Sequence, residues 1–174
     1  MNKTSLNFAV LASAVLGACA HPQPQPQPPS PCTTPEPVRV LLTAAANVNP
    51  GESGEPLATT VRIYQLRDTA KLVESSIDRL LDGDRGILGE DFVSMQELTL
   101  YPGERAAPAI ARGEGAKNLA VVAFFRRPVG PSWRAIRQLP APNPQHCHGT
   151  PATAAALAAA QLRFTLEASR IEMR

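Results

Sequence analysis

The sequence predicts an all-β domain, a two-sheet β-sandwich with a short helical insertion after its second strand. Six or seven short segments alternate apolar and polar residues with the period of a strand. Proline, glycine and asparagine separate them, and the apolar spacing shifts to that of a helix only once. Many short strands with regular turns and a single helical interruption are typical of a sandwich.

Residues 1–18 have the pattern of a lipoprotein signal peptide. Lys3 is their only charge, a short apolar run follows it, and Leu16-Gly17-Ala18-Cys19 forms a lipobox. The apolar run is shorter than the roughly 20 residues of a membrane-spanning helix. We therefore expect the Cys19 sulfur to carry covalent lipid, which anchors the chain stably when several acyl chains are attached. The alternative is an ordinary signal peptide cleaved nearby, with Cys19 incidental.

The residue after Cys19 predicts which membrane holds the lipid anchor. Ala20 stands where an aspartate would resemble an inner-membrane retention signal. We therefore expect the protein on the periplasmic face of the outer membrane.

Residues 19–37 form a proline-rich tether. Eight of the chain's 18 prolines lie between residues 21 and 37. Alternating prolines favour extended polyproline II at about 3.1 Å per residue, so the tether can hold a domain up to roughly 50 Å from the bilayer. A ligand for an SH3-type domain has the same composition. Residues 38–174 remain as one domain long enough for its own core.

The two other cysteines, Cys32 and Cys147, would share an oxidising compartment. They form either a disulfide that closes a long loop or two free thiols. Lys3 would be lost with the signal peptide, which leaves 16 basic and 15 acidic residues. This near balance of net charge gives no electrostatic reason to expect nucleic acid or an anionic membrane surface as a partner.

The first predicted strand starts at residue 38 and ends before a loop that has two prolines, two glycines and no apolar residue. We expect this loop to project into solvent. The second strand covers residues 59–66, with Val61 and Ile63 on one face and Arg62 and Tyr64 on the other. The loop between the two strands consists of Asn49, Pro50, Gly51, Glu52, Ser53, Gly54, Glu55 and Pro56.

The helical insertion begins after Asp68, a candidate N-cap, and its apolar residues recur at steps of three and four. It forms one helix or two short consecutive ones, ending at the glycines 83, 86 and 89. A strand over residues 94–101 and a weaker one over 106–111 should follow.

Residues 118–126 are apolar on both faces, which predicts a central strand. Residues 133–139 form its partner, and residues 162–168 alternate cleanly before the phase slips near Ser169, where a bulge or strand end is expected. Residues 152–160, rich in alanine, form a helical turn or a loop.

The sequence shows no catalytic, metal or cofactor site apart from the lipid on Cys19. Gly51 to Gly54 lacks the spacing of a nucleophile elbow. His146, Cys147 and His148 are adjacent, so they cannot all face one ion, and no second pair has zinc spacing. The residues indicate a lipid-tethered binding module rather than an enzyme acting on a small molecule.

Several strings in fixed order carry a family resemblance. They are the lipobox, the Asn-Pro-Gly turn, VRIYQLRD at 61–68, YPGE at 101–104, VVAFFR at 121–126 and Trp133-Arg134. This combination resembles the TssJ lipoproteins (SciN/VasD-like) of the type VI secretion system. The resemblance implies a transthyretin-like sandwich, an outer-membrane lipid anchor, and binding of the periplasmic C-terminal region of TssM, whose inner-membrane partner is TssL.

The resemblance also implies that the loop at residues 49–56 contacts TssM, although an ordinary connecting turn would have the same sequence. A different class of function remains open, a periplasmic ligand-binding or hydrolytic lipoprotein that shares the sandwich. The long tether and the loop around Cys147 have no counterpart in the resemblance.

Overall fold

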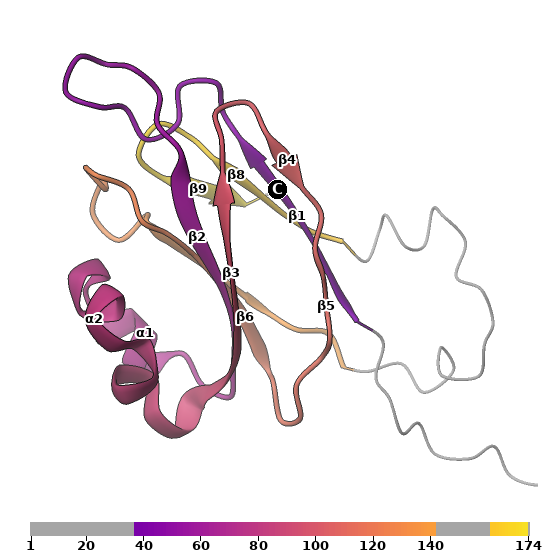
Figure 1. Cartoon of the computed structure of the whole chain (residues 1–174). Coiled ribbons are helices and arrows are strands. Elements are labelled where there is room, and N and C mark those ends of the chain that lie inside the picture. The colour runs from indigo at the N-terminus through magenta and orange to yellow at the C-terminus, as the bar shows by residue number, and fades with distance from the viewer. Residues whose placement is uncertain (1–36, 142–160, 174) are drawn as a thin grey trace, which may run out of the picture. The chain divides into compact units, whose positions relative to one another are not determined.

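A computed structural model describes residues 37–141 and 161–173. These residues form two facing sheets, which confirms the predicted all-β sandwich (Figure 1). Sheet one has the order β4-β1-β8-β9, with β5 also pairing with β1, and sheet two has the order β3-β2-β6-β7. The strands are β1 Val38–Ala44, β2 Thr59–Leu66, β3 Phe92–Leu100, β4 Arg105–Ala106, β5 Ala109–Ile110, β6 Asn118–Ala123, β7 Arg134–Gln138, β8 Leu162–Leu166 and β9 Ile171–Met173.

Sheet one combines two kinds of pairing on the two edges of β1. β8 runs parallel to β1 with Leu42 opposite Phe164, and β4 and β5 run antiparallel on the other edge. Pro108 separates β4 from β5 because it has no amide hydrogen to donate, while its carbonyl accepts from Val40 N at 3.2 Å. The predicted weak strand over 106–111 is therefore two short pieces.

Sheet two is antiparallel throughout. β2 pairs with β3 along its whole length and with β6 on its other edge, and β7 pairs with β6. A register shift at Gln65 and Leu66 bends the end of β2. β6 is buried on both faces, as its continuous apolar sequence predicts.

The alternation within each strand places its apolar residues between the sheets. In β1, Val40 and Leu42 are fully buried, and in β2 Val61 and Ile63 face them from the other sheet. The inward-facing residues of β6 and β8 complete this core: Leu119, Val121, Ala123, Phe164 and Leu166.

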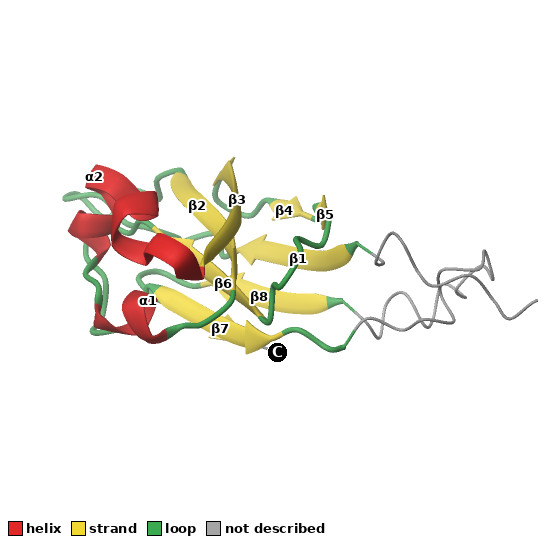
Figure 2. Ribbon diagram, turned by 90° about the horizontal axis from the view of Figure 1, so that it is seen from below, coloured by secondary structure: helices red, strands yellow, loops and turns green. Residues whose placement is uncertain are grey.

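The helices α1 (Ala70–Glu74) and α2 (Ile77–Leu88), followed by the short 3₁₀ turn η1 (Gly89–Asp91), cover the outer face of sheet two (Figure 2). Tyr64, on the outward face of β2, is fully buried beneath them, as are the helical residues Leu72, Leu80 and Leu88. The guanidinium of Arg62 donates to Leu80 O at 2.8 Å, which ties α2 to the sheet.

The helical insertion differs in two details from the prediction. The N-cap of α1 is Thr69, whose side chain makes no capping bond, so Asp68 lies one residue earlier and only accepts from Ala70 N at 2.8 Å. Gly83 only kinks α2, with φ 173° and ψ 82°, and the helix continues through Gly86 to Leu88. Glycine lowers helix propensity, but packing of Leu80 and Leu88 onto the sheet outweighs that cost.

Of the two alternatives predicted near Ser169, a bulge or a strand end, the structure has the strand end, since β8 stops at Leu166 and a turn follows. Glu167 N donates to Arg170 O at 2.8 Å, and the chain reverses into β9. Cys19, Cys32, Cys147, the neighbouring histidines and the alanine-rich segment lie outside the described residues. No helix of the described ranges is long and apolar enough to cross a membrane.

Candidate partner-binding surface

Four connections meet at the end of the sandwich where β1, β3, β6 and β8 finish (Figure 1). Backbone hydrogen bonds join them: Gly103 N donates to Ala45 O at 3.3 Å, and Val129 N donates to Ser169 O at 3.2 Å. We call this group the loop cluster. It consists of residues 45–58, 101–104, 124–133 and 167–170.

Asn49 joins three of these connections. Its φ is 50°, a left-handed conformation that asparagine tolerates better than most residues. Its side chain donates to Ala58 O at 3.2 Å and accepts from Arg126 N at 2.8 Å, while its own N–H donates to Ala168 O at 2.8 Å. Because Asn49 is buried and bonded in three directions, the base of the β1–β2 loop is fixed.

The tip of the β1–β2 loop is a turn closed by its own backbone. Gly51 N donates to Glu55 O at 2.8 Å, and Ser53 N donates to Glu55 Oε2 at 3.1 Å. A Cβ on Gly51 would meet only the carboxylate end of the exposed Glu55 side chain, which can move aside. Residues 52–56 are exposed, as the sequence predicts, whereas Asn49 and Gly51 are buried in the base.

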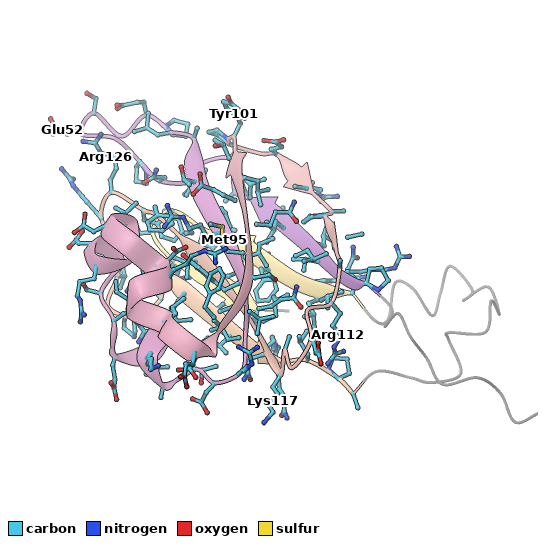
Figure 3. The ribbon with its side chains drawn as sticks, turned by 60° about the horizontal axis from the view of Figure 1, so that its bottom comes forward. Glu52, Met95, Tyr101, Arg112, Lys117 and Arg126 are labelled. Atoms are coloured by element: carbon cyan, nitrogen blue, oxygen red, sulfur yellow. The ribbon has the colours of Figure 1, made fainter. Side chains whose placement is uncertain are left out.

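Charge on the loop cluster is mixed and open to solvent. Glu52 Oε1 lies 3.7 Å from Arg126 Nη2, and both side chains are more than half exposed (Figure 3). Such a pair contributes about 0–1 kcal/mol. Both groups therefore remain available to charges on a partner.

Two large apolar side chains stand exposed on the same end. Tyr101 is 62% exposed at the β3–β4 turn, where its N–H donates to Glu104 Oε2 at 2.8 Å, and Val129 is 63% exposed in the β6–β7 loop. Val129 lines a cavity of about 330 Å³ with Asn47 and residues 167–170. Exposed aromatic and aliphatic groups beside mixed charges are typical of a protein-binding surface.

A larger cavity, of about 470 Å³, lies beside the β5–β6 connection and Gln138 to Ala141. Its Arg112 donates to Pro140 O at 2.6 Å and to Ala116 O at 3.5 Å, so the guanidinium is already engaged by carbonyls. Lys117 lies near it (Figure 3). Within residues 37–141 and 161–173, no group of three His, Cys, Asp or Glu side chains could hold a metal ion.

The structure brings together residues that the sequence could not connect. Arg126 lies 77 positions from Asn49, and no local pattern links them. Tyr101 and Val129 also reach this end only through the antiparallel order of sheet two. The Asn-Pro-Gly turn was the one signal in the sequence for this surface.

No curated protein matches the chain. Among solved structures, the T6SS lipoprotein TssJ1 from Pseudomonas aeruginosa is similar, with 26% identity and a TM-score of 0.64 over 80% of this chain and 95% of that one. A chain of a type VI membrane complex has 23% identity and a TM-score of 0.64, over 80% and 98%. A chain in the structure of the T6SS protein TssM C-terminal domain from EAEC has 21% identity and a TM-score of 0.62, also over 80% and 98%.

The two likenesses below 25% identity concern the fold alone. A family model covers most of the sandwich, from residue 36 to residue 168. The model describes T6SS-SciN, the type VI secretion lipoproteins that include VasD, EvfM and TssJ. The chain belongs to this family of type VI secretion lipoproteins.

Proposed function

We propose that this protein anchors the type VI secretion membrane complex to the outer membrane. Lipid on Cys19 holds the chain at the periplasmic face, and the loop cluster binds the periplasmic C-terminal region of TssM, which joins it indirectly to TssL. The protein acts by holding two structures together and catalyses no reaction. Membership of the secretion lipoprotein family supports this role, as do the names of the membrane complex and the TssM domain structure among its structural neighbours.

The observation that carries the proposal is the contrast between the base and the tip of the β1–β2 loop. The base is fixed by Asn49 to two other connections, and the tip presents Glu52 and its neighbours to solvent. A rigid projecting loop loses little conformational entropy when it binds, which favours affinity. The loop at residues 49–56 is therefore the contact we assign to TssM.

The course of β1 supports the same role. Val38 follows the tether directly, and β1 runs from there to the loop cluster at the far end of the sandwich. At about 3.3 Å per residue, its seven residues separate the two attachment points by roughly 20 Å. Force between the lipid anchor and TssM would pass along a central strand that is hydrogen-bonded on both edges.

Binding to the purified periplasmic domain of TssM tests the proposal. Reversal of charge in Glu52→Lys places a cation beside Arg126 and removes the carboxylate from the tip, so we expect the affinity to fall by about tenfold, or about 1.4 kcal/mol. Glu114→Lys makes the same change in net charge at an exposed site in the β5–β6 connection and should leave the affinity unchanged.

A second variant removes residues 52–54 and keeps the bonds of Asn49. Circular dichroism would establish that it folds. Unchanged affinity in both tip variants would refute the loop assignment, and a wild-type chain that does not bind TssM at all would refute the function.

A further inference from the structure

The outer face of sheet one carries a cluster of arginines that the partner-binding surface does not use. In β1, Arg39, Leu41 and Thr43 alternate with the core residues and therefore point away from the core. Arg163 of β8 lies directly opposite Leu41, and Arg105 of β4 lies opposite Thr43 on the other edge. Three arginines thus surround one half-buried leucine, and we call this group the arginine face.

The arginine face has no charge partner among the residues that the structure describes. None of the ion pairs found within residues 37–141 and 161–173 includes Arg39, Arg105 or Arg163. Arg39 Nε is buried and also lacks a hydrogen-bond acceptor in these ranges. The nearby Glu172 on β9 pairs with Arg170 at 2.7 Å and not with an arginine of this face.

No described helix covers this face. α1 and α2 lie on the outer side of sheet two (Figure 2). Arg105 and Arg163 are exposed, and Leu41 and Thr43 are half-buried. The outer face of sheet one therefore presents a cationic surface with one apolar side chain, Leu41, among the arginines.

We infer that the arginine face rests on the anionic phospholipid headgroups of the membrane that anchors the chain. A guanidinium binds phosphate oxygens in a bidentate geometry, and each arginine near an anionic surface raises membrane partition by about fivefold. Three arginines alone bind weakly. The tether makes the contact effective, because it keeps the face near the headgroups at a local concentration on the order of millimolar. This inference rests on the lipid anchoring in the proposed function.

Charge favours a bilayer over a second copy of the chain as the occupant. Two arginine faces brought together would place six guanidinium groups in one interface, and the nearby Glu172 already pairs with Arg170, so the contact is repulsive. Membrane contact through sheet one also leaves the loop cluster, at the strand ends, and the helices, on sheet two, uncovered. Docking on the membrane and binding of TssM are therefore compatible.

The single tryptophan of the chain, Trp133, gives a direct readout. It is buried at the start of β7, and facing sheets lie about 10 Å apart, so docking of sheet one brings it close to the headgroups. The mature lipoprotein would be reconstituted into vesicles that carry a dansyl headgroup acceptor. We expect more energy transfer from Trp133 in phosphatidylcholine vesicles containing phosphatidylglycerol than in vesicles without it. The excess should vanish near 1 M salt, where the screening length is about 3 Å.

The double variant Arg105→Glu, Arg163→Glu should lower the equilibrium constant for docking by at least about 25-fold, from two factors of five. A matched control, Arg79→Glu with Arg137→Glu, changes net charge equally on α2 and β7 and should keep the wild-type transfer. Far-UV circular dichroism checks that both variants fold.

Equal transfer with and without phosphatidylglycerol, or an equal loss in the control variant, would overturn the inference. Transfer in neutral vesicles that rises with protein density and disappears in the double variant would assign the face to a second copy instead. A chain that fails to float with any vesicle would show that lipid anchoring itself is absent, which separates failure of the proposed function from failure of this inference.

Discussion

Asn49 fixes the base of the β1–β2 loop, whose tip is exposed to solvent. Asn49→Ala would remove two partly buried side-chain hydrogen bonds and would place alanine at φ 50°, a backbone conformation that it tolerates less well than asparagine. We expect a loss of about 2–3 kcal/mol in the free energy of unfolding, since Ala58 O and Arg126 N lose their partner. Urea denaturation measures it. Asn47→Ala, at an exposed site of the same loop, is the control, and equal losses in both variants would contradict the role of Asn49.

Tyr64 predicts an alkaline limit to stability. Burial beneath the helices raises the pKa of Tyr64 to about 12, with the Asp84 carboxylate adding to the effect. The unfolded chain releases this proton near pH 10, whereas the native state keeps it until about pH 12. The native state therefore binds more protons between these values, and stability falls as pH rises through them, by about 2–3 kcal/mol in total. Below pH 10 Tyr64 contributes no pH dependence.

Tyr64→Phe tests this alkaline loss. The Tyr64 hydroxyl is buried and has no hydrogen-bond partner within the described residues, so its removal should cost little at neutral pH. Chemical denaturation at several pH values should show a flatter profile above pH 10 for this variant. The control Tyr101→Phe alters the exposed tyrosine and should retain the wild-type profile. If stability of Tyr64→Phe depends on pH as it does in the wild type, burial of Tyr64 is not the source of the alkaline loss of stability.

At the scale of elements, the sequence predicts those whose pattern is set locally. β1 and β2 alternate in and out of one core, and β6 is apolar on both faces because helices cover the side that the core does not. The pattern is lost in β4 and β5, which have two residues each, too few for a period to appear. The continuation of α2 through Gly86 depends on packing against sheet two, which no local propensity reports.

The sequence also did not predict which distant strands pair with each other. The parallel match of Leu42 with Phe164 joins strands about 120 residues apart, and strand pattern alone does not choose a neighbour or a direction. The candidate site was likewise only partly predictable from the sequence. Proline and glycine predicted the exposed tip of the β1–β2 loop, but Arg126 reaches Asn49 only because β6 ends beside the start of β2.

Arg134 holds the short helix α1 onto sheet two. Its Nη2 donates to Val73 O at 2.9 Å and its Nη1 to Ser75 O at 3.5 Å, so the cation lies at the C-terminal end of α1, where the helix dipole is negative. A five-residue helix is unstable by itself. We expect Arg134→Ala to destabilise the protein by about 1 kcal/mol and to speed hydrogen exchange in residues 70–75. Arg137→Ala, on the same strand, should leave that exchange unchanged.

At the scale of the whole molecule, the proposed anchoring and the proposed binding of TssM would depend on separate parts of the chain. The core and the loop cluster lie entirely within residues 38–173, and the candidate lipid site precedes them in the sequence. The two functions should therefore be separable by substitution. Stability of the sandwich does not require the membrane, because both sheets bury their inner faces against each other.

Cys19→Ser tests this separation. Serine has no sulfur for thioether formation, so the variant should carry no lipid and should leave the outer-membrane fraction. Its affinity for the periplasmic domain of TssM should stay within about twofold of wild type, because no part of the loop cluster changes. Type VI secretion should stop, since TssM would be bound to a protein with no hold on the membrane. Cys32→Ser, in the tether, should keep the lipid. If cells with Cys19→Ser still secrete although the protein is shown to carry no lipid, the sandwich acts without a mechanical link to the membrane.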